Sequence, residues 1–339
     1  MFQKNIKRAL IVVFIFLCVG RFAFAQELPL KESQENLSPR CSSSQDCKQP
    51  GMLGVCQFPG EKTSKCFYRE IIDIPVIVIL PDNCRSCQTG LALRDLQMML
   101  PGLRAEYIKN SDPRAKELIK KFGISMLPAY VLSKEAEREE IFADLAETVE
   151  YKDGEYYLKP EHSGVSFFLS RKFKKKNLDL FLILLRPGMF HAVKLAKDLK
   201  KKDKDIKLNI HFVAMKAPET GVLISPEGAR EVEEDTLYAC IEKQYPKKAL
   251  DYLSCRLADV KSLWWEDCAK KNGVDVQRIK KCARSREGQK LFEQKIKISD
   301  ELKVRYAPLF LMENVEIFGI SESTDAQEIL NVLESKTNK

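Results

Sequence analysis

Two largely apolar runs mark the chain, at residues 74–80 (IPVIVIL) and 178–185 (LDLFLILL). Runs of this length and composition are typical of strands that are buried on both faces of a sheet. Each run is followed by a break, an amphipathic helical pattern and a second strand pattern, at 104–110 or at 207–214. Because the strand–helix–strand order occurs twice, the pattern predicts an α/β protein with two domains.

The first of these units continues with further helix and turn signals. Asp112, followed by a proline, predicts the start of a helix that runs to Lys121, since Asp is a good N-cap and Pro is tolerated at the first helical position. Residues 135–149 have a helical, acidic pattern. The Asp-Gly pair at 153–154, between two short Tyr-bearing segments, predicts a hairpin turn.

A Cys-x-x-Cys motif, Cys84-Arg85-Ser86-Cys87, lies between the first buried strand and its helix. The segment 120–132 (KKFGISMLPAYVL) follows, and its proline, Pro128, lies 44 residues after Cys84. This combination resembles the thioredoxin superfamily, in which a short helix ends at Gly and a cis-proline opens the next strand. The resemblance implies that Pro128 is cis and packs beside the Cys-x-x-Cys motif, and that Leu127 offers backbone groups to a substrate chain.

The same resemblance implies dithiol–disulfide exchange, with Cys84 as the nucleophile and Cys87 as the resolving cysteine. We expect Cys84 at the very start of the helix, where free N–H groups and the helix dipole stabilise a thiolate, and Cys87 one turn further on. The Arg85 cation should favour the thiolate as well. Two alternatives remain open. One is a purely structural disulfide, and the other is a metal site, although no second ligand pair follows at zinc-like spacing.

The second half repeats the plan with two departures. Residues 306–312 (YAPLFLM), followed by a turn and a short strand, resemble the cis-proline strand of the same superfamily, which implies that Pro308 is cis. No cysteine is present at 187–191, where the family places its motif. A long helical region, about 225–300, separates the two parts and resembles the insertion of the DsbA-like branch. A closing helix is expected at 325–333.

The N-terminus has the pattern of a secretory signal peptide, with a basic start, an apolar run at 9–20 and a small-x-small site at 23–25. We therefore expect cleavage before Gln26 and export, most simply to a bacterial periplasm; the alternatives are an uncleaved anchor and a eukaryotic secretory lumen. No later segment is long and apolar enough to predict a membrane span. Removal of residues 1–25 takes away four basic and no acidic residues, so the formal charge falls from +8 to +4. The remaining basicity is local, and it does not predict nucleic-acid binding.

Ten cysteines remain after Cys18 is removed with the signal peptide, an even number that fits full pairing in an exported protein. They form three even groups, of which the middle one is the Cys-x-x-Cys motif. The other two groups are expected to form structural disulfides, with their pairings left open: Cys41, Cys47, Cys56 and Cys66; and Cys240, Cys255, Cys268 and Cys282. For the last group, the alternative to purely structural disulfides is that one pair transfers electrons to or from Cys84 and Cys87. Trp264 and Trp265 are expected to pack inside the helical region.

These patterns divide the chain into five parts: a signal peptide (1–25), a small Cys-rich segment (26–70), a thioredoxin-like domain (71–170), a basic linker (171–177) and a degenerate DsbA-like domain (178–339). The function predicted from them is an exported thiol–disulfide oxidoreductase that acts on protein disulfides and needs no cofactor or metal. The expected partners are protein thiols or disulfides, a redox partner and, as an option, a second copy of the chain. The alternative is a non-catalytic binding or scaffold protein in which all the disulfides are structural.

Overall fold

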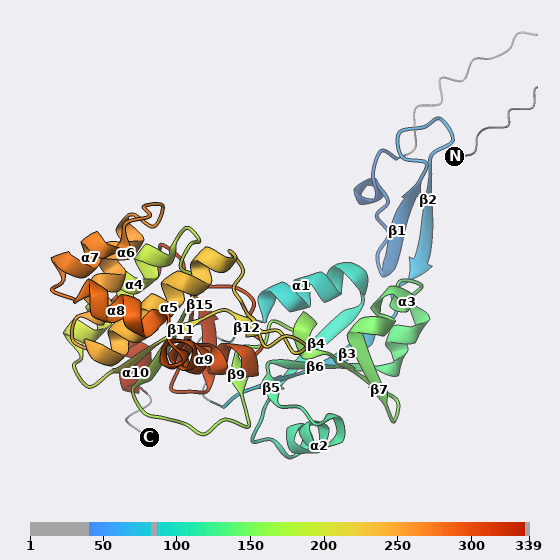
Figure 1. The fold of residues 1–339 in the computed structure, drawn as a ribbon. Helices are drawn as coiled ribbons and strands as arrows, with labels where there is room; N and C mark the ends of the chain where they lie inside the picture. Colours follow the sequence, from blue (N-terminus) through green and yellow to red (C-terminus); the bar gives the residue numbers. More distant parts are fainter. Residues whose placement is uncertain (1–40, 83–86, 88, 336–339) are drawn as a thin grey trace, which may run out of the picture. The chain divides into compact units, whose positions relative to one another are not determined.

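The computed structural model describes residues 41–82, 87 and 89–335 (Figure 1). It divides between Arg69 and Glu70 into two compact units, and each is described by itself. Among the described residues, no helix combines the length and the apolar character that crossing a bilayer requires.

Two disulfides hold the N-terminal unit together. Its elements are η1 (Ser44–Asp46), β1 (Met52–Gln57) and β2 (Lys65–Glu70), and the two strands form a small sheet. Of the three pairings open to the four cysteines, the structure has Cys41–Cys56 and Cys47–Cys66. The cysteines themselves form the core, with Tyr68 packed against them. Because so small a unit buries little apolar surface, the disulfides must supply most of its stability, about 2–4 kcal/mol each.

Five strands form the first sheet of the larger unit, in the order β4-β3-β6-β8-β7. Their bounds are β3 (Ile74–Leu80), β4 (Leu103–Lys109), β6 (Ala129–Ser133), β7 (Val149–Lys152) and β8 (Glu155–Leu158). Strands β3 and β4 are parallel, and the other neighbours are antiparallel. The turn between β7 and β8 has positive φ at Asp153 and Gly154, as the hairpin signal in the sequence requires.

Helices α1 (Gly90–Met99) and α2 (Pro113–Phe122) cover opposite faces of this sheet (Figure 1). Side chains of β3 contribute to both faces of the sheet. Val76 and Val78 belong to the apolar cluster that contains the buried residues of α1, and Ile79 belongs to the cluster that contains those of α2. The predicted helix at 135–149 is broken into three short pieces, η2 (Lys134–Arg138), α3 (Phe142–Leu145) and η3 (Ala146–Thr148). Another short turn, η4 (Pro160–His162), follows β8.

Six strands form the second sheet, in the order β11-β10-β14-β15-β9-β5. Their bounds are β5 (Met126–Leu127), β9 (Phe167–Phe168), β10 (Asn177–Leu182), β11 (Lys207–Phe212), β14 (Leu309–Met312) and β15 (Glu316–Gly319). Strands β10 and β11 are parallel, while β14 is antiparallel to β10 and β15 is antiparallel to β14. A separate two-stranded ribbon consists of β12 (Met215–Lys216) and β13 (Leu223–Ile224).

Strands β5 and β9 join the second sheet although the sequence pattern assigns both segments to the first domain. Strand β9 pairs with β15 on one side and with β5 on the other. The basic stretch 171–177 is also anchored rather than free. Arg171 donates to the side-chain oxygen of Asn314 and pairs with Glu301. The chain itself connects the two sheets, because β5 of the second sheet leads through Pro128 into β6 of the first.

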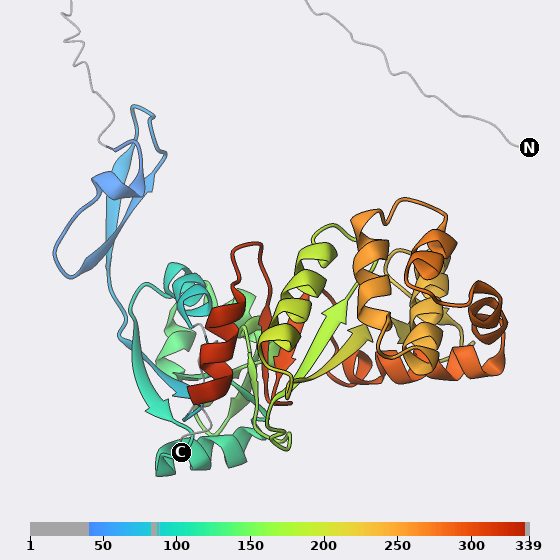
Figure 2. The ribbon, with the colours of Figure 1, turned by 90° about the vertical axis from the view of Figure 1, so that its left-hand side faces the viewer.

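Helices α4 (Met189–Lys202) and α10 (Ala326–Ser335) pack on one face of the second sheet. Between β13 and β14 the chain forms five helices, which lie together beyond β11 in Figure 2: α5 (Ala229–Gln244), α6 (Ala249–Ala258), α7 (Trp265–Lys271), α8 (Val276–Ala283) and α9 (Arg286–Glu301). Each of the first four carries one cysteine, and the disulfides Cys240–Cys282 and Cys255–Cys268 tie them in two pairs. Cross-helix disulfides of this kind clamp the helical region.

The two adjacent tryptophans of this region have different environments. Trp265 is 6 % exposed and belongs to the main core, whereas Trp264 is 69 % exposed. The prediction that both pack inside the helical region is therefore wrong for Trp264. The reason is local, because α7 begins at Trp265 and only that side chain lies on the face that contacts the other helices.

Candidate functional site

The cis-proline of the first half lies at a junction between the two sheets. The Leu127–Pro128 peptide bond is cis, and it joins β5 of the second sheet to β6 of the first. The chain reaches this point through Gly123, whose φ of 64° ends α2 in the left-handed conformation that glycine adopts at low cost. Leu127 and Ala129, on either side of Pro128, are both buried in the core of α2.

The backbone edge beside Pro128 is occupied by the chain itself. The carbonyl oxygen of Leu127 accepts from the N–H of Ser166 at 2.9 Å, and that of Ser125 accepts from the N–H of Leu169 at 2.9 Å. In the ladder, Leu127 lies opposite Phe167. The prediction that Leu127 offers its backbone to a substrate chain is thus wrong for its carbonyl group, because residues 166–169 already take that edge.

Cys87 lies ahead of helix α1 rather than inside it. The helix begins at Gly90, so the prediction that Cys87 lies one turn into the helix is wrong. Thr89 is the N-cap residue, and its carbonyl oxygen accepts the first hydrogen bond of the helix from the N–H of Leu93 at 3.0 Å. Cys87 is partly buried and disulfide-bonded. Its partner is none of the eight cysteines in the four disulfides described above.

Cys84 and Arg85 lie outside the described residues. The pairing of Cys84 with Cys87, the position of the nucleophilic sulfur and the influence of Arg85 on it therefore stay predictions. The described residues place the two flanks of the motif: β3 ends at Leu80, and the first helical turn after Cys87 carries Leu91 and Ala92.

The second half has a cis peptide bond at the corresponding place, Ala307–Pro308, directly before β14. The loop after β10 ends at Gly188, whose φ is 88°. His191 follows in the first turn of α4, and its Nε2 is buried with no hydrogen-bond partner in the described part of the chain.

Buried carboxyl groups of α5 support the loop that precedes Gly188. Glu231 accepts from the backbone N–H of Leu185 at 3.2 Å and from that of Glu227 at 3.0 Å. Burial raises the pKa of Glu231 above its ordinary value. One turn further on, burial and then the nearby Glu231 charge raise the pKa of Asp235 well above its ordinary value. The interior of this half therefore favours a protonated carboxyl group at Asp235.

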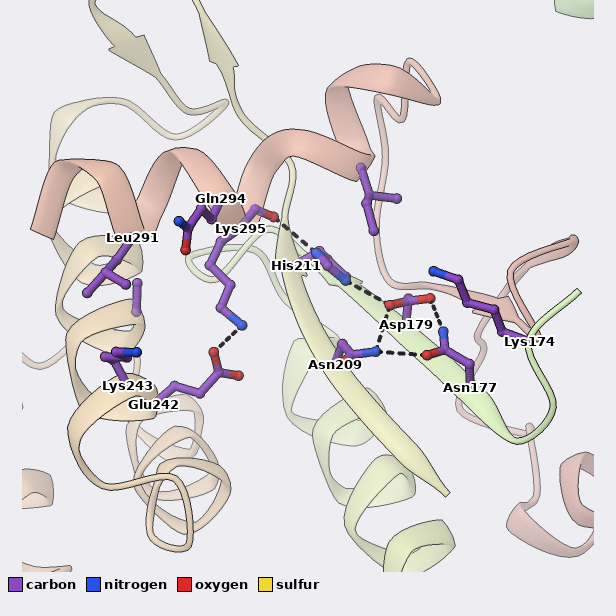
Figure 3. Close-up of a pocket in the computed structure, with 12 residues that line it drawn as sticks. Lys174, Asn177, Asp179, Asn209, His211, Glu242, Lys243, Leu291, Gln294 and Lys295 are labelled. Carbon is purple, nitrogen blue, oxygen red and sulfur yellow. Dashed lines mark hydrogen bonds and ion pairs between the residues drawn. The ribbon is translucent and has the colours of Figure 1, made fainter. Parts of the chain in front are cut away.

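A polar cluster that the sequence analysis missed lies on the other face of the second sheet, under α9 (Figure 3). It lines a cavity of about 490 Å³. The Asp179 carboxylate accepts from His211 Nε2 at 2.9 Å, from the Asn209 amide at 3.0 Å and from the Asn177 amide at 2.5 Å. His211 Nδ1 lies 3.2 Å from the carbonyl oxygen of Lys295 in α9. The Lys295 side chain pairs with Glu242 of α5, the neighbouring helix.

Both ring nitrogens of His211 have a partner. Nε2 faces the carboxylate of Asp179, and Nδ1 faces the carbonyl oxygen of Lys295. The side chains of His211 and Asp179 are only 9 % and 4 % exposed. Every polar atom of this pair is engaged by the protein, so the cluster joins α9 to the sheet and leaves no free group for chemistry. The signal in the sequence was two polar residues at alternate positions in each of two apolar strands, β10 and β11.

No protein-family model matches the chain, and no curated protein is similar to it in sequence. Among solved structures, the thiol–disulfide exchange protein alpha-DsbA2 from Wolbachia pipientis is similar at 14% identity, over 50% of this chain and 88% of that chain, with a TM-score of 0.35. The oxidoreductase NmDsbA1 from N. meningitidis is similar at 11% identity, over 47% and 82%, with a TM-score of 0.36. A thioredoxin-like oxidoreductase from Silicibacter pomeroyi is similar at 12% identity, over 48% and 87%, with a TM-score of 0.34. Values this low assign neither a family nor an activity to the chain.

Proposed function

We propose that residues 70–339 contain two thioredoxin-fold domains in tandem, and that the chain is an exported thiol–disulfide oxidoreductase acting through Cys84 and Cys87. Each of the two sheets contains the same set of strands, a parallel pair joined to an antiparallel strand that a cis-proline precedes. In this proposal α5–α9 are a helical insertion into the second domain, as in the DsbA-like branch of the superfamily.

The observation that carries the proposal is the cis peptide bond at Pro128. It opens β6, which is antiparallel to β3, and β3 is the strand that leads to the Cys-x-x-Cys motif. Together with the disulfide at Cys87, this arrangement supports a redox-active pair rather than an isolated pair of cysteines.

The proposed reaction exchanges one disulfide for another. The Cys84 thiolate attacks one sulfur of a substrate disulfide, the substrate S–S bond breaks, and one substrate thiolate leaves. The thiolate of Cys87 then attacks the sulfur of Cys84 in the mixed disulfide and releases the second substrate thiolate. Two electrons pass from the dithiol to the substrate, and the reverse sequence oxidises a substrate dithiol.

Export is proposed from the N-terminal signal pattern, and the disulfides of the described residues support it. Cys41–Cys56, Cys47–Cys66 and the two pairs of the helical region are structural in this proposal. Four such bonds fit an oxidising compartment such as the periplasm, because cytosolic thiols are kept reduced.

A second candidate is a non-catalytic binding protein built on the same two folds. The occupied edge beside Pro128 favours it, because a thioredoxin-fold enzyme that binds extended chains there would have to displace residues 166–169 first. The absence of cysteine at 187–191 favours it as well for the second domain.

The reduction potential of the Cys84–Cys87 pair separates the two candidates. After equilibration with glutathione or dithiothreitol buffers, we expect a potential between about −120 and −270 mV, the range of disulfide oxidoreductases. We expect Cys84→Ser to abolish turnover and Cys87→Ser to accumulate mixed disulfides with protein substrates. The Cys255→Ala/Cys268→Ala double variant, which removes a disulfide of the helical region, is the control and should retain activity. A pair that stays oxidised well below about −300 mV would establish a structural disulfide and the binding protein instead.

A further inference from the structure

A second cavity, of about 690 Å³, opens beside the segment that occupies the Pro128 edge. It is lined by the first turn of α1, by residues 164–166, by β15 and by the chain that leads into α10. Leu91 of α1 lies only four residues after Cys87, so the cavity begins close in sequence to the proposed redox pair. Its volume falls within the range of roughly 300–1,000 Å³ that ligand pockets occupy.

Ser166 provides the first sign that the cavity binds a ligand. Its N–H donates to the Leu127 carbonyl at 2.9 Å, and its own carbonyl accepts from the N–H of Ile317 at 2.7 Å, so its backbone is fixed from both sides. The residue is 7 % exposed, and its hydroxyl group has no hydrogen-bond partner in the described part of the chain. A buried hydroxyl group without a partner is costly, and one that lines a cavity is positioned to bond to whatever fills it.

The charge of the lining indicates what that ligand is. Two acidic residues line the cavity, the exposed Glu328 on α10 and the fully buried Glu316 on β15, and no Lys, Arg or His among the described residues does. In a chain with 56 Lys and Arg against 48 Asp and Glu, such a lining selects cationic groups over anionic ones. Leu91 and Tyr306, which are 61 % and 66 % exposed, add large apolar side chains to the same cavity.

We propose that this cavity binds a segment of the polypeptide substrate, one that carries an apolar side chain next to a lysine or arginine. The inference rests on the proposed oxidoreductase function. Since the chain itself fills the strand position beside Pro128, a substrate chain needs another surface near Cys87, and this cavity offers apolar contact, hydroxyl groups and negative charge there. The second domain, which has no cysteine at 187–191, thereby contributes to substrate selection.

The test uses a probe without cysteine, so that binding is independent of thiol chemistry. We would measure the fluorescence anisotropy of a fluorescein-labelled, end-blocked hexapeptide of alternating leucine and lysine with the full chain, and compare it with the same peptide carrying glutamate in place of lysine. The lysine peptide should bind about tenfold more tightly, with a difference that shrinks as salt is added.

Three variants connect the binding to the cavity. Ser166→Ala should weaken binding of the lysine peptide about fivefold through a lost hydrogen bond, without lowering the unfolding temperature, since its hydroxyl group has no partner to lose among the described residues. Glu328→Gln should weaken it about threefold. Glu322→Gln removes the same charge from an exposed residue of the same segment that does not line the cavity, and it should have no effect.

Equal binding of the two peptides, or no response to Ser166→Ala and Glu328→Gln, would overturn the inference. It would also be overturned if sedimentation showed that a second copy of the chain fills the cavity, with a dimer that Glu328→Gln weakens. Failure of the peptide to bind, with a Cys84–Cys87 potential in the oxidoreductase range, would refute the cavity proposal and leave the redox function intact. Specific binding with a pair that resists reduction would support the cavity and refute the enzyme.

Discussion

Replacing Asp235 by Asn tests the buried acid of the second half. Burial, and next the nearby Glu231 charge, raise the pKa of Asp235 well above its ordinary value of 3.8, and its Oδ1 has no hydrogen-bond partner among the described residues. Ser225 donates to the other oxygen at 3.3 Å. Asn has the same shape and can accept the same bond, but it does not ionise, so the substitution removes the titration and little else.

The sign of the effect follows from proton linkage. Above pH 3.8 the unfolded chain loses this proton while the folded protein keeps it, so the free energy of unfolding falls as pH rises toward the folded-state pKa of Asp235. One proton corresponds to about 1.4 kcal/mol for each pH unit. The Asn variant lacks this dependence. Its stability relative to the parent protein should therefore be higher at pH 6 than at pH 5, by at most about 1.4 kcal/mol.

The assay is urea unfolding followed by tryptophan fluorescence, with the disulfides intact. Both tryptophans of the chain lie in the helical region, and Trp265 shares the core of Tyr238 on α5, so the signal reports on the part of the molecule that holds Asp235. Glu233→Gln, an exposed acid on the same helix, is the matched control and should leave the pH dependence unchanged. If the difference between Asp235→Asn and the parent is the same at both pH values, the carboxyl group is not protonated in the folded protein and the reasoning fails.

Four other variants test the second half of the chain by urea unfolding, followed by tryptophan fluorescence except where a tryptophan is replaced. Asp179→Asn replaces the carboxylate that accepts from His211, Asn209 and Asn177 and should lower the free energy of unfolding by about 1–3 kcal/mol; a loss below about 0.5 kcal/mol would contradict the structural role of the cluster. Trp265→Ala, followed by circular dichroism, should cost about 3–5 kcal/mol and Trp264→Ala less than about 0.5 kcal/mol; equal losses would refute the difference in burial. Joint replacement of Cys240 and Cys282 by Ala opens a loop of 42 residues and should cost about 4 kcal/mol, whereas an unchanged urea midpoint would show that the loop is held by packing alone.

Local signals in the sequence were sufficient for most of the secondary structure. The apolar run at 74–80 coincides with β3, and Asp112 caps α2 by accepting from the N–H of Arg114 at 2.8 Å. These features depend on side-chain periodicity and on hydrogen bonds between near neighbours in the chain, so they can be predicted from the sequence. The segment 135–149, predicted to be one helix, forms three short helical pieces between β6 and β7. Helix propensity is a weak preference, and tertiary packing overrides it here.

Contacts between distant residues required the tertiary structure. The sequence alone determined an α/β chain with two strand–helix–strand units, a Cys-x-x-Cys motif and an even set of cysteines. Only the fold decided that residues 166–169 fill the edge beside Pro128, that His211 meets Asp179 across two parallel strands, and which cysteines pair. Strand register and sheet order bring these groups together over long separations in the chain, and no short-range pattern records that proximity.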